Sequence, residues 1–216
     1  MPKISTNAGI AEKYTTKYSQ AANDARITKT KAALEANGFK VRVVEDLQQL
    51  HNAVIKMIPE GSEVFTATSR TLDEAGLSEE LNSDRYKSVR KMFMPLNGQP
   101  DNELKMKRIG SASDYAIGSV HAITEEGKVF IASASGSQLP NYVYGAKNFI
   151  WVVGSQKLVK DVNEAVDRIE NYAFHLEDER AQQAYGINSS INKILVYRKE
   201  PTGRGTIFIV KETVGF

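Results

Sequence analysis

The chain has 216 residues, of which 41% are hydrophobic and 25% are charged, a composition typical of a folded globular protein rather than a disordered one. Its 28 basic and 26 acidic residues give a formal net charge of +2, which argues against a nucleic-acid partner because no strong positive field is present. The chain contains no cysteine, which excludes disulfides, thiolate nucleophiles and cysteine-ligated zinc or iron–sulfur sites within it.

The sequence also lacks the signals of membrane insertion and of common cofactors. No apolar run approaches the roughly 18 residues of a membrane span, and the polar N-terminus has no signal-peptide core. We therefore expect a cytoplasmic protein with no membrane partner. His51, His121 and His175 form no metal-ligand spacing, and neither GxGxxG nor GxxxxGK[ST] occurs. We predict no metal site and no bound cofactor.

The first part of the chain alternates helices with strands. Residues 1–20 are polar and are predicted to form an N-terminal arm, and 21–216 a single α/β domain. Apolar spacing predicts a helix that ends at Asn37-Gly38, because glycine favours the conformation that closes a helix. A strand over 39–43, a helix over 47–57 and a strand over 64–67 follow. This order indicates a largely parallel sheet.

The second part is more varied. A third helix runs to Leu81, capped by Thr68 or Ser69. Residues 83–110 are predicted to be irregular, and their excess of basic side chains favours either a solvated surface or an anion-attracting flank. The remaining predictions are a hairpin of strands over 119–124 and 128–133, a strand over 149–153, a helix from Asp161, and two late strands over 194–197 and 207–210 that complete the sheet.

Two polar segments directly follow predicted strands and are candidates for anion binding. Hydroxyls and free amides at strand ends can converge on a carboxylate or phosphate, which makes Ser135, Gly136 and Ser137 candidate ligand contacts. Turn formation by serine and glycine is the alternative interpretation. Ser69, Arg70 and Thr71 form the second segment, in which Arg70 could bind a carboxylate through two hydrogen bonds, although helix capping explains the hydroxyls equally well.

The hairpin turn supplies a candidate catalytic carboxylate. Glu125 and Glu126 are adjacent, and neighbours on an extended chain point to opposite faces, so at most one of them faces a site. We choose Glu125 as the candidate catalytic residue. A solvent-exposed turn carboxylate is the alternative.

An ordered set of motifs resembles the LUD (lactate utilisation) domain family, as a single-domain member without iron–sulfur cysteines. The match runs from about Ala21 to the last residue. It departs from the family at the hairpin, where Glu125-Glu126-Gly127-Lys128 replaces an acid-Thr-Gly-Thr run. The motifs are Ser69-x-Thr71-x-x-Glu74-x-Gly76-Leu77, Glu125-x-Gly127, Leu139-Pro140, the strand over 150–153 with Asp161-x-x-x-Ala165, and Val210-x-Glu212-x-x-Gly215-Phe216.

The resemblance implies a mostly parallel, three-layer Rossmann-like α/β fold with a hairpin, akin to ribose-5-phosphate isomerases and CoA-transferases. It implies a role in oxidation of L-lactate, or a related 2-hydroxy acid, to the 2-oxo acid. A small anionic metabolite and iron–sulfur oxidoreductase subunits would be the partners. A non-catalytic assembly subunit and a sugar-phosphate isomerase or CoA-transferase-like enzyme stay open as alternatives, and so does self-association into a homo-oligomer.

Overall fold

A large parallel sheet forms the centre of the protein in a computed structural model that describes residues 16–216. Its six strands pair in the order β1-β10-β7-β4-β2-β3, and every pair is parallel. The strands are β1 (Lys40–Val44), β2 (Glu63–Thr66), β3 (Lys87–Ser88), β4 (Tyr115–Gly118), β7 (Asn148–Gly154) and β10 (Gly205–Val210). Parallel sheets need cover on both faces, which explains why the central strands are continuously apolar.

Strand β7 shows how the sequence divides between the two faces. Phe149, Trp151 and Val153 belong to one apolar core cluster, whereas Ile150 and Val152 belong to another. This alternation follows from the two-residue period of a strand. The sheet is therefore the middle layer between two separate cores.

Three helices cover one face of the large sheet: α3 (Leu47–Met57), α4 (Arg70–Glu74) and α5 (Leu77–Leu81). The sequence predicted a single helix up to Leu81, and this prediction was wrong at Gly76. There the backbone adopts φ +67°, in the left-handed region, which ends α4 and starts α5. Ser69 caps α4, as expected, by accepting a hydrogen bond from the amide of Leu72 at 3.4 Å.

The other face is covered by α2 (Asp24–Ala36) and by a second sheet. That small sheet has the order β8-β5-β6-β9, comprising β5 (Ala122–Thr124), β6 (Val129–Ser133), β8 (Leu158–Val159) and β9 (Lys193–Tyr197). β5 and β6 are antiparallel, which confirms the predicted hairpin. The large sheet between its two covering layers has the mostly parallel, three-layer Rossmann-like α/β architecture that was predicted.

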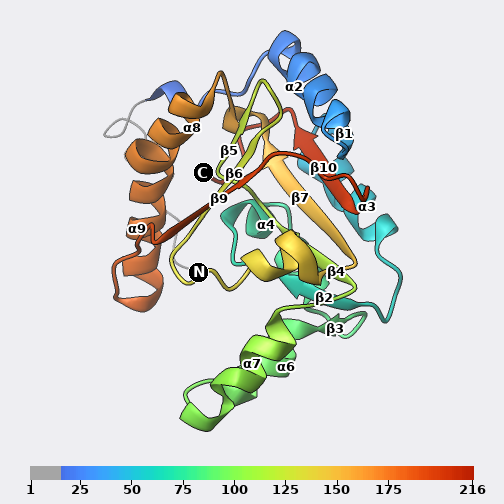
Figure 1. Cartoon of the computed structure of the whole chain (residues 1–216), viewed down its shortest axis with the longest axis vertical. Helices are drawn as coiled ribbons and strands as arrows, with labels where there is room; N and C mark the ends of the chain where they lie inside the picture. The colour runs from blue at the N-terminus through green and yellow to red at the C-terminus, as the bar shows by residue number, and fades with distance from the viewer. Residues whose placement is uncertain (1–15) are drawn as a thin grey trace.

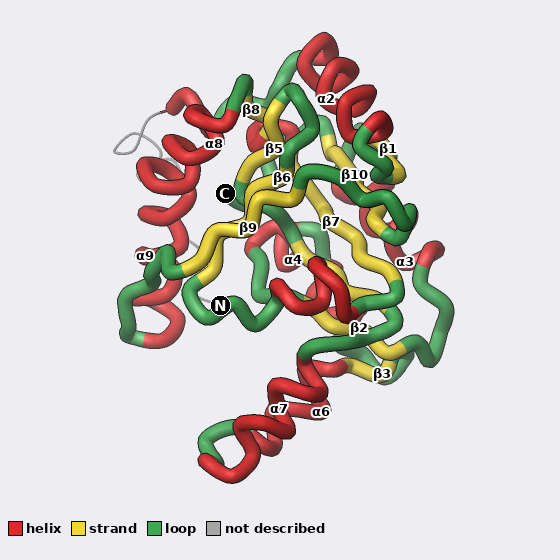
Figure 2. Tube along the Cα trace, viewed as in Figure 1, coloured by secondary structure: helices red, strands yellow, loops and turns green. Residues whose placement is uncertain are grey.

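The outer face of the small sheet carries a third core cluster. A nearly continuous helical stretch packs there, made of α8 (Val162–Arg168), the π-helical turn Ile169–Ala173 and α9 (Phe174–Tyr185). Figure 2 shows the small sheet lying between these helices and the large sheet. Tyr18, in the short 3-10 helix Thr16–Tyr18, is buried in the same cluster, so the last residues of the predicted arm pack on the body. The rest of that predicted arm, residues 1–15, lies outside the described residues.

The two late strands do not complete one sheet, contrary to the sequence prediction. β9 pairs antiparallel with β6 in the small sheet, whereas β10 lies between β1 and β7 in the large one. Strand spacing along the chain carries no information about this partition, because the partition depends on which distant strands each strand pairs with.

The stretch 83–110 is also more ordered than predicted. It contains β3, α6 (Val89–Phe93) and α7 (Glu103–Gly110), joined by two 3-10 turns, Met94–Leu96 and Pro100–Asn102. α6 and α7 pack on each other and project from the body (Figure 1). Only Val89 is buried in either helix, so their apolar period is too weak to detect in the sequence. Across residues 16–216, helices that could cross a bilayer are absent.

Candidate functional site

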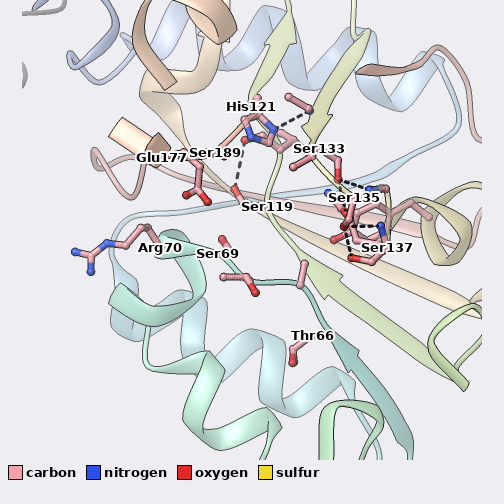
Figure 3. Close-up of a pocket in the computed structure, with 18 of the residues that line it drawn as sticks. Thr66, Ser69, Arg70, Ser119, His121, Ser133, Ser135, Ser137, Glu177 and Ser189 are labelled. Atoms are coloured by element: carbon pink, nitrogen blue, oxygen red, sulfur yellow. Dashed lines mark hydrogen bonds between the residues drawn. The ribbon is translucent and has the colours of Figure 1, made fainter. Parts of the chain in front are cut away.

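A cavity of about 760 Å³ lies at the carboxyl ends of β2, β4 and β7, three neighbouring strands of the large sheet. Its wall includes the residues that follow each strand: Ala67 to Thr71 after β2, Ser119 to His121 after β4, and Lys157 after β7. The loop after β6 closes it from the small sheet, and Figure 3 shows how these segments face one another. Ligands of open α/β sheets bind at this edge.

The structure brings together the two polar segments that the sequence singled out. Ser69, Arg70 and Thr71 line the cavity from the large sheet, and Ser135 to Ser137 line it from the small one. In Figure 3 the Arg70 side chain extends away from the serines, and its guanidinium pairs with Glu74 at 3.1 Å.

The loop of Ser135, Gly136 and Ser137 is shaped by its own hydroxyls. The Gly136 amide donates to Ser133 Oγ at 2.8 Å, and the Ser137 amide donates to Ser135 Oγ at 3.2 Å. Gly136 has φ +83°, which favours glycine. The hydroxyls of Ser135 and Ser137 are exposed and 3.1 Å apart, so this loop presents polar groups to the cavity while it also forms a turn.

Glu125 lies elsewhere. It is the first residue of the turn between β5 and β6, beside α2, where its carboxylate pairs with Arg26 at 3.0 Å and with Lys29 at 2.7 Å. The pKa of Glu125 is lowered, mainly by the hydrogen bond that its carboxylate accepts from Lys29. The cavity wall does not include Glu125, so the structure does not join this candidate catalytic residue to the other predicted site residues.

Lys157 is a cavity residue that sequence reasoning missed. It ends the 3-10 helix Ser155–Lys157, directly after β7, and is only 1% exposed. Its Nζ donates to Thr71 Oγ1 at 2.9 Å and to Ser119 Oγ at 3.0 Å. Burial, together with the charge of Arg168, holds the pKa of Lys157 well below its usual value. The only sequence signal was a lone lysine at the end of a long apolar strand.

His121 is a neutral neighbour of this lysine. Its Nδ1 accepts a hydrogen bond from the Ala132 amide at 3.0 Å, so the ring proton is assigned to Nε2. Burial, reinforced by Lys157 and Arg168, lowers the pKa of His121 to about 3. A neutral imidazole at the cavity wall can donate one hydrogen bond to a ligand without adding charge.

Tyr142 adds an unpartnered donor to the wall. It belongs to the π-helical turn Asn141–Gly145, is fully buried, and its hydroxyl has no hydrogen-bond partner. A methyl group on Gly118 would overlap this hydroxyl, which places it directly over the end of β4. Burial raises the pKa of Tyr142, so the hydroxyl keeps its proton and can donate it. A buried donor without a partner is costly and is a common feature of ligand sites.

Basic side chains outnumber acidic ones on the wall of the cavity. It carries one acidic side chain among the described residues, Glu177, which Arg180 binds through both carboxylate oxygens at 2.7 Å. Five basic side chains share the wall: Arg70, Arg90, Lys107, Lys157 and Arg180. Arg90 and Lys107 come from the projecting α6–α7 pair, so part of the basic stretch 83–110 faces the cavity and part faces solvent.

Two of these cations have no carboxylate partner among the described residues. Arg90 donates to Thr68 Oγ1 at 3.2 Å, and Lys157 donates only to hydroxyls. The remaining three are paired with Glu74, Glu103 and Glu177. Within residues 16–216, acidic and histidine side chains nowhere gather in the group of three that a metal ion would need.

Comparison with known proteins agrees with this architecture. A crystal structure of a DUF162-family protein from Deinococcus radiodurans superposes with a TM-score of 0.52 at 13% sequence identity, over 88% of this chain and 99% of that one. At this identity the likeness shows the fold alone. No curated protein matches the chain. The model of the LUD domain matches residues 27–210, which is most of the sequence. The chain therefore belongs to the LUD-domain family.

Proposed function

We propose that the protein binds a small organic anion, L-lactate or a related 2-hydroxy acid and its 2-oxo acid, in the cavity at the end of β4. Membership of the LUD-domain family supports a role related to lactate utilisation in general. The observation that carries the proposal is the excess of basic side chains on the wall, where five stand against one acidic side chain and Arg90 has no carboxylate partner among residues 16–216. Such a wall attracts anions and disfavours cations.

Polar groups suited to a carboxylate come from both sheets. Ser69 and Thr71 approach from the large sheet, Ser135 and Ser137 from the small sheet, and the free Tyr142 hydroxyl lies near β4. These groups supply hydrogen bonds that fix a ligand's orientation, while Arg90 supplies a positive charge that no carboxylate among residues 16–216 neutralises. Glu125 is not part of this proposed site.

In this proposal, a partner protein accepts the electrons that are released when the 2-hydroxy acid is oxidised. The chain has no cysteine, so cysteine-ligated iron–sulfur clusters would belong to other subunits. The protein would hold the 2-hydroxy acid while those iron–sulfur subunits accept its electrons. The cytoplasm is the compartment that we propose for this reaction.

The test is calorimetric titration of the full chain with lactate, pyruvate and a sugar phosphate. The sugar phosphate is included because lactate and pyruvate are small for this cavity. Each has six non-hydrogen atoms, which at about 30 Å³ per atom fill only roughly a quarter of the cavity volume. Binding should weaken with salt, as expected for contacts between charges. Absence of heat with all three compounds would refute the proposal.

A matched pair of variants locates the site. Arg90→Met removes an unpaired cavity cation, and the loss of one charge-assisted hydrogen bond of about 1.5–3 kcal/mol corresponds to roughly 10- to 100-fold weaker binding. Lys29→Met makes the same change of charge outside the cavity, beside Glu125, and should leave the affinity unchanged. Equal losses in both variants would point to a general charge effect instead of a site.

The projecting α6–α7 pair favours a second candidate function, that of an assembly subunit. Met94, in the turn that follows α6, and Leu104, in α7, are 60% and 58% exposed, which suits a protein contact. A stable complex with iron–sulfur subunits that survives Arg90→Met but is lost on Met94→Asp would support it.

A sugar-phosphate isomerase or CoA-transferase chemistry would need Glu177 as its carboxylate, and Arg180 already binds both oxygens of that group.

A further inference from the structure

Lys157 differs from the other basic side chains of the cavity because it is both almost fully buried and without a counter-charge. Its side chain is 1% exposed, and it takes part in none of the ion pairs found among residues 16–216. Its contacts are two hydroxyl oxygens, Thr71 Oγ1 and Ser119 Oγ. Burial of an ammonium group without a carboxylate partner has an unfavourable free energy, so the neutral amine form of Lys157 is favoured.

The hydrogen-bond inventory also fits a neutral amine. The Thr71 hydroxyl directs its own proton to the Val214 carbonyl at 3.4 Å, and the Ser119 hydroxyl directs its proton to the Val120 carbonyl at 3.4 Å. Both hydroxyls therefore accept from Lys157. A neutral amine has two N–H groups, which these oxygens satisfy, and one lone pair, which is left without a donor.

The nearby positive charge also favours a neutral Lys157, and the nearby negative charge already has other partners. Arg168, which is fully buried, lowers the pKa of Lys157 in addition to the effect of burial. Glu74 opposes this shift, but its carboxylate is engaged by Arg70 at 3.1 Å and by the Gly215 amide at 2.8 Å. The neighbouring His121 is neutral and supplies no negative charge.

We propose that the Nζ atom of Lys157 forms an imine with the keto carbon of a 2-oxo acid held in the cavity, an inference that rests on the proposed function above. The Nζ lone pair bonds to the keto carbon while the C=O π electrons move to the oxygen, and a proton passes from nitrogen to that oxygen. The carbinolamine then loses one water as the C=N bond forms, and no oxidant or reductant is consumed.

The cavity also offers a proton donor for the keto oxygen. The Tyr142 hydroxyl is buried and unpartnered, and it lies over Gly118, the residue before Ser119. It can donate to the oxygen as charge develops there. Arg90 is the free cation on the same wall for the carboxylate of the 2-oxo acid.

Reductive trapping tests this inference. The full chain is incubated with pyruvate and cyanoborohydride, and its intact mass and peptide map are measured. We expect one adduct per chain, located on Lys157, with at least ten times more label there than on the exposed Lys199. Lactate, which has a hydroxyl in place of the keto group and therefore cannot form an imine, should give no adduct under the same conditions.

Variants and outcomes separate this inference from the proposed function. Lys157→Met should lose the adduct, and Lys199→Met should keep it. Should Lys157→Met fail to fold, the site of labelling in the native sequence still decides the question. Pyruvate binding by calorimetry without an adduct on Lys157 would overturn the imine and leave the proposed function standing. Labelling spread evenly over exposed lysines would also overturn it, whereas absence of heat with lactate, pyruvate and the sugar phosphate would overturn the proposed function itself.

Discussion

Lys157→Met should change the pH dependence of folding stability as well as ligand chemistry. In the unfolded chain a lysine has a pKa of about 10.4 and is protonated at pH 7 to 9. In the native protein the pKa of Lys157 is well below its usual value, so the native state binds fewer protons there. Since stability rises with pH wherever the unfolded state binds more protons, this lysine makes the native protein less stable at neutral pH than at pH 10.

The size of this pH effect is set by the one proton that Lys157 takes up when the protein unfolds. Between the native pKa of Lys157 and about pH 10.4, this group adds up to about 1.4 kcal/mol per pH unit to the free energy of unfolding. Lys157→Met removes that slope and leaves all other titrating groups in place. The variant should be more stable than the native sequence at pH 7, and the gap should close as the pH rises. The lost hydrogen bonds to Thr71 and Ser119 offset part of the gain by about 1 kcal/mol each, but this offset does not depend on pH.

Urea unfolding at pH 7, 8 and 9, without ligand, measures these slopes. Lys199→Met is the control, because Lys199 is exposed and its replacement should leave the slope of the native sequence unchanged. Identical slopes for the native sequence and Lys157→Met would refute the reasoning, since they would show that Lys157 is protonated in the folded protein.

Three further substitutions test one contact of the cavity and two structural contacts outside it. Gly118→Ala drives a methyl group into the Tyr142 hydroxyl, and thermal unfolding should show a loss of about 1–3 kcal/mol together with weaker pyruvate binding; an unchanged affinity would contradict the placement of that hydroxyl. Arg204→Met leaves the buried Glu200 carboxylate and four carbonyls of the loop over 141–146 without their cation, so urea unfolding should show a loss of about 3–5 kcal/mol. Glu125→Gln should cost at most about 1 kcal/mol at pH 7 and leave anion binding intact. Because the pKa of Glu125 is lowered, its contribution is present above pH of about 4.3 and should vanish as pH falls through the native value; a loss of anion binding would restore Glu125 to the site.

The fold was predictable where local signals agree with burial. Helix α3 begins at the Asp46 cap and buries Leu50 and Val54 at helical spacing, and β7 is a continuous apolar run. Prediction failed where structure depends on distant contacts. β4 contributes only four residues and is recognisable mainly by its pairing with β2 and β7. The assignment of β9 and β10 to different sheets is equally invisible in the sequence.

The site was predictable to the extent that it lies on loops after strands. Ser69 to Thr71 and Ser135 to Ser137 follow strands that the sequence identified, and the structure places both segments on one cavity. Glu125 follows a strand as well, but its hairpin turns toward α2 and away from the cavity. Lys157 was missed because its burial arises from three elements that converge on it, and a lone lysine in a sequence is usually exposed.

The two buried basic side chains Arg168 and Lys157 differ in the contacts that they make with the rest of the protein. Arg168, also fully buried, has a structural role, because it donates to the His121 carbonyl and stacks over the Tyr172 ring at 5.2 Å. Lys157 donates only to two hydroxyls of the cavity wall, and each of them already has a carbonyl for its own proton. An apolar side chain of similar length would fill the same space and remove the desolvation cost. The amine of Lys157 is therefore better explained by a ligand in the cavity than by the stability of the fold. This explanation requires that Lys157→Met be more stable than the native sequence and yet unable to bind or trap pyruvate.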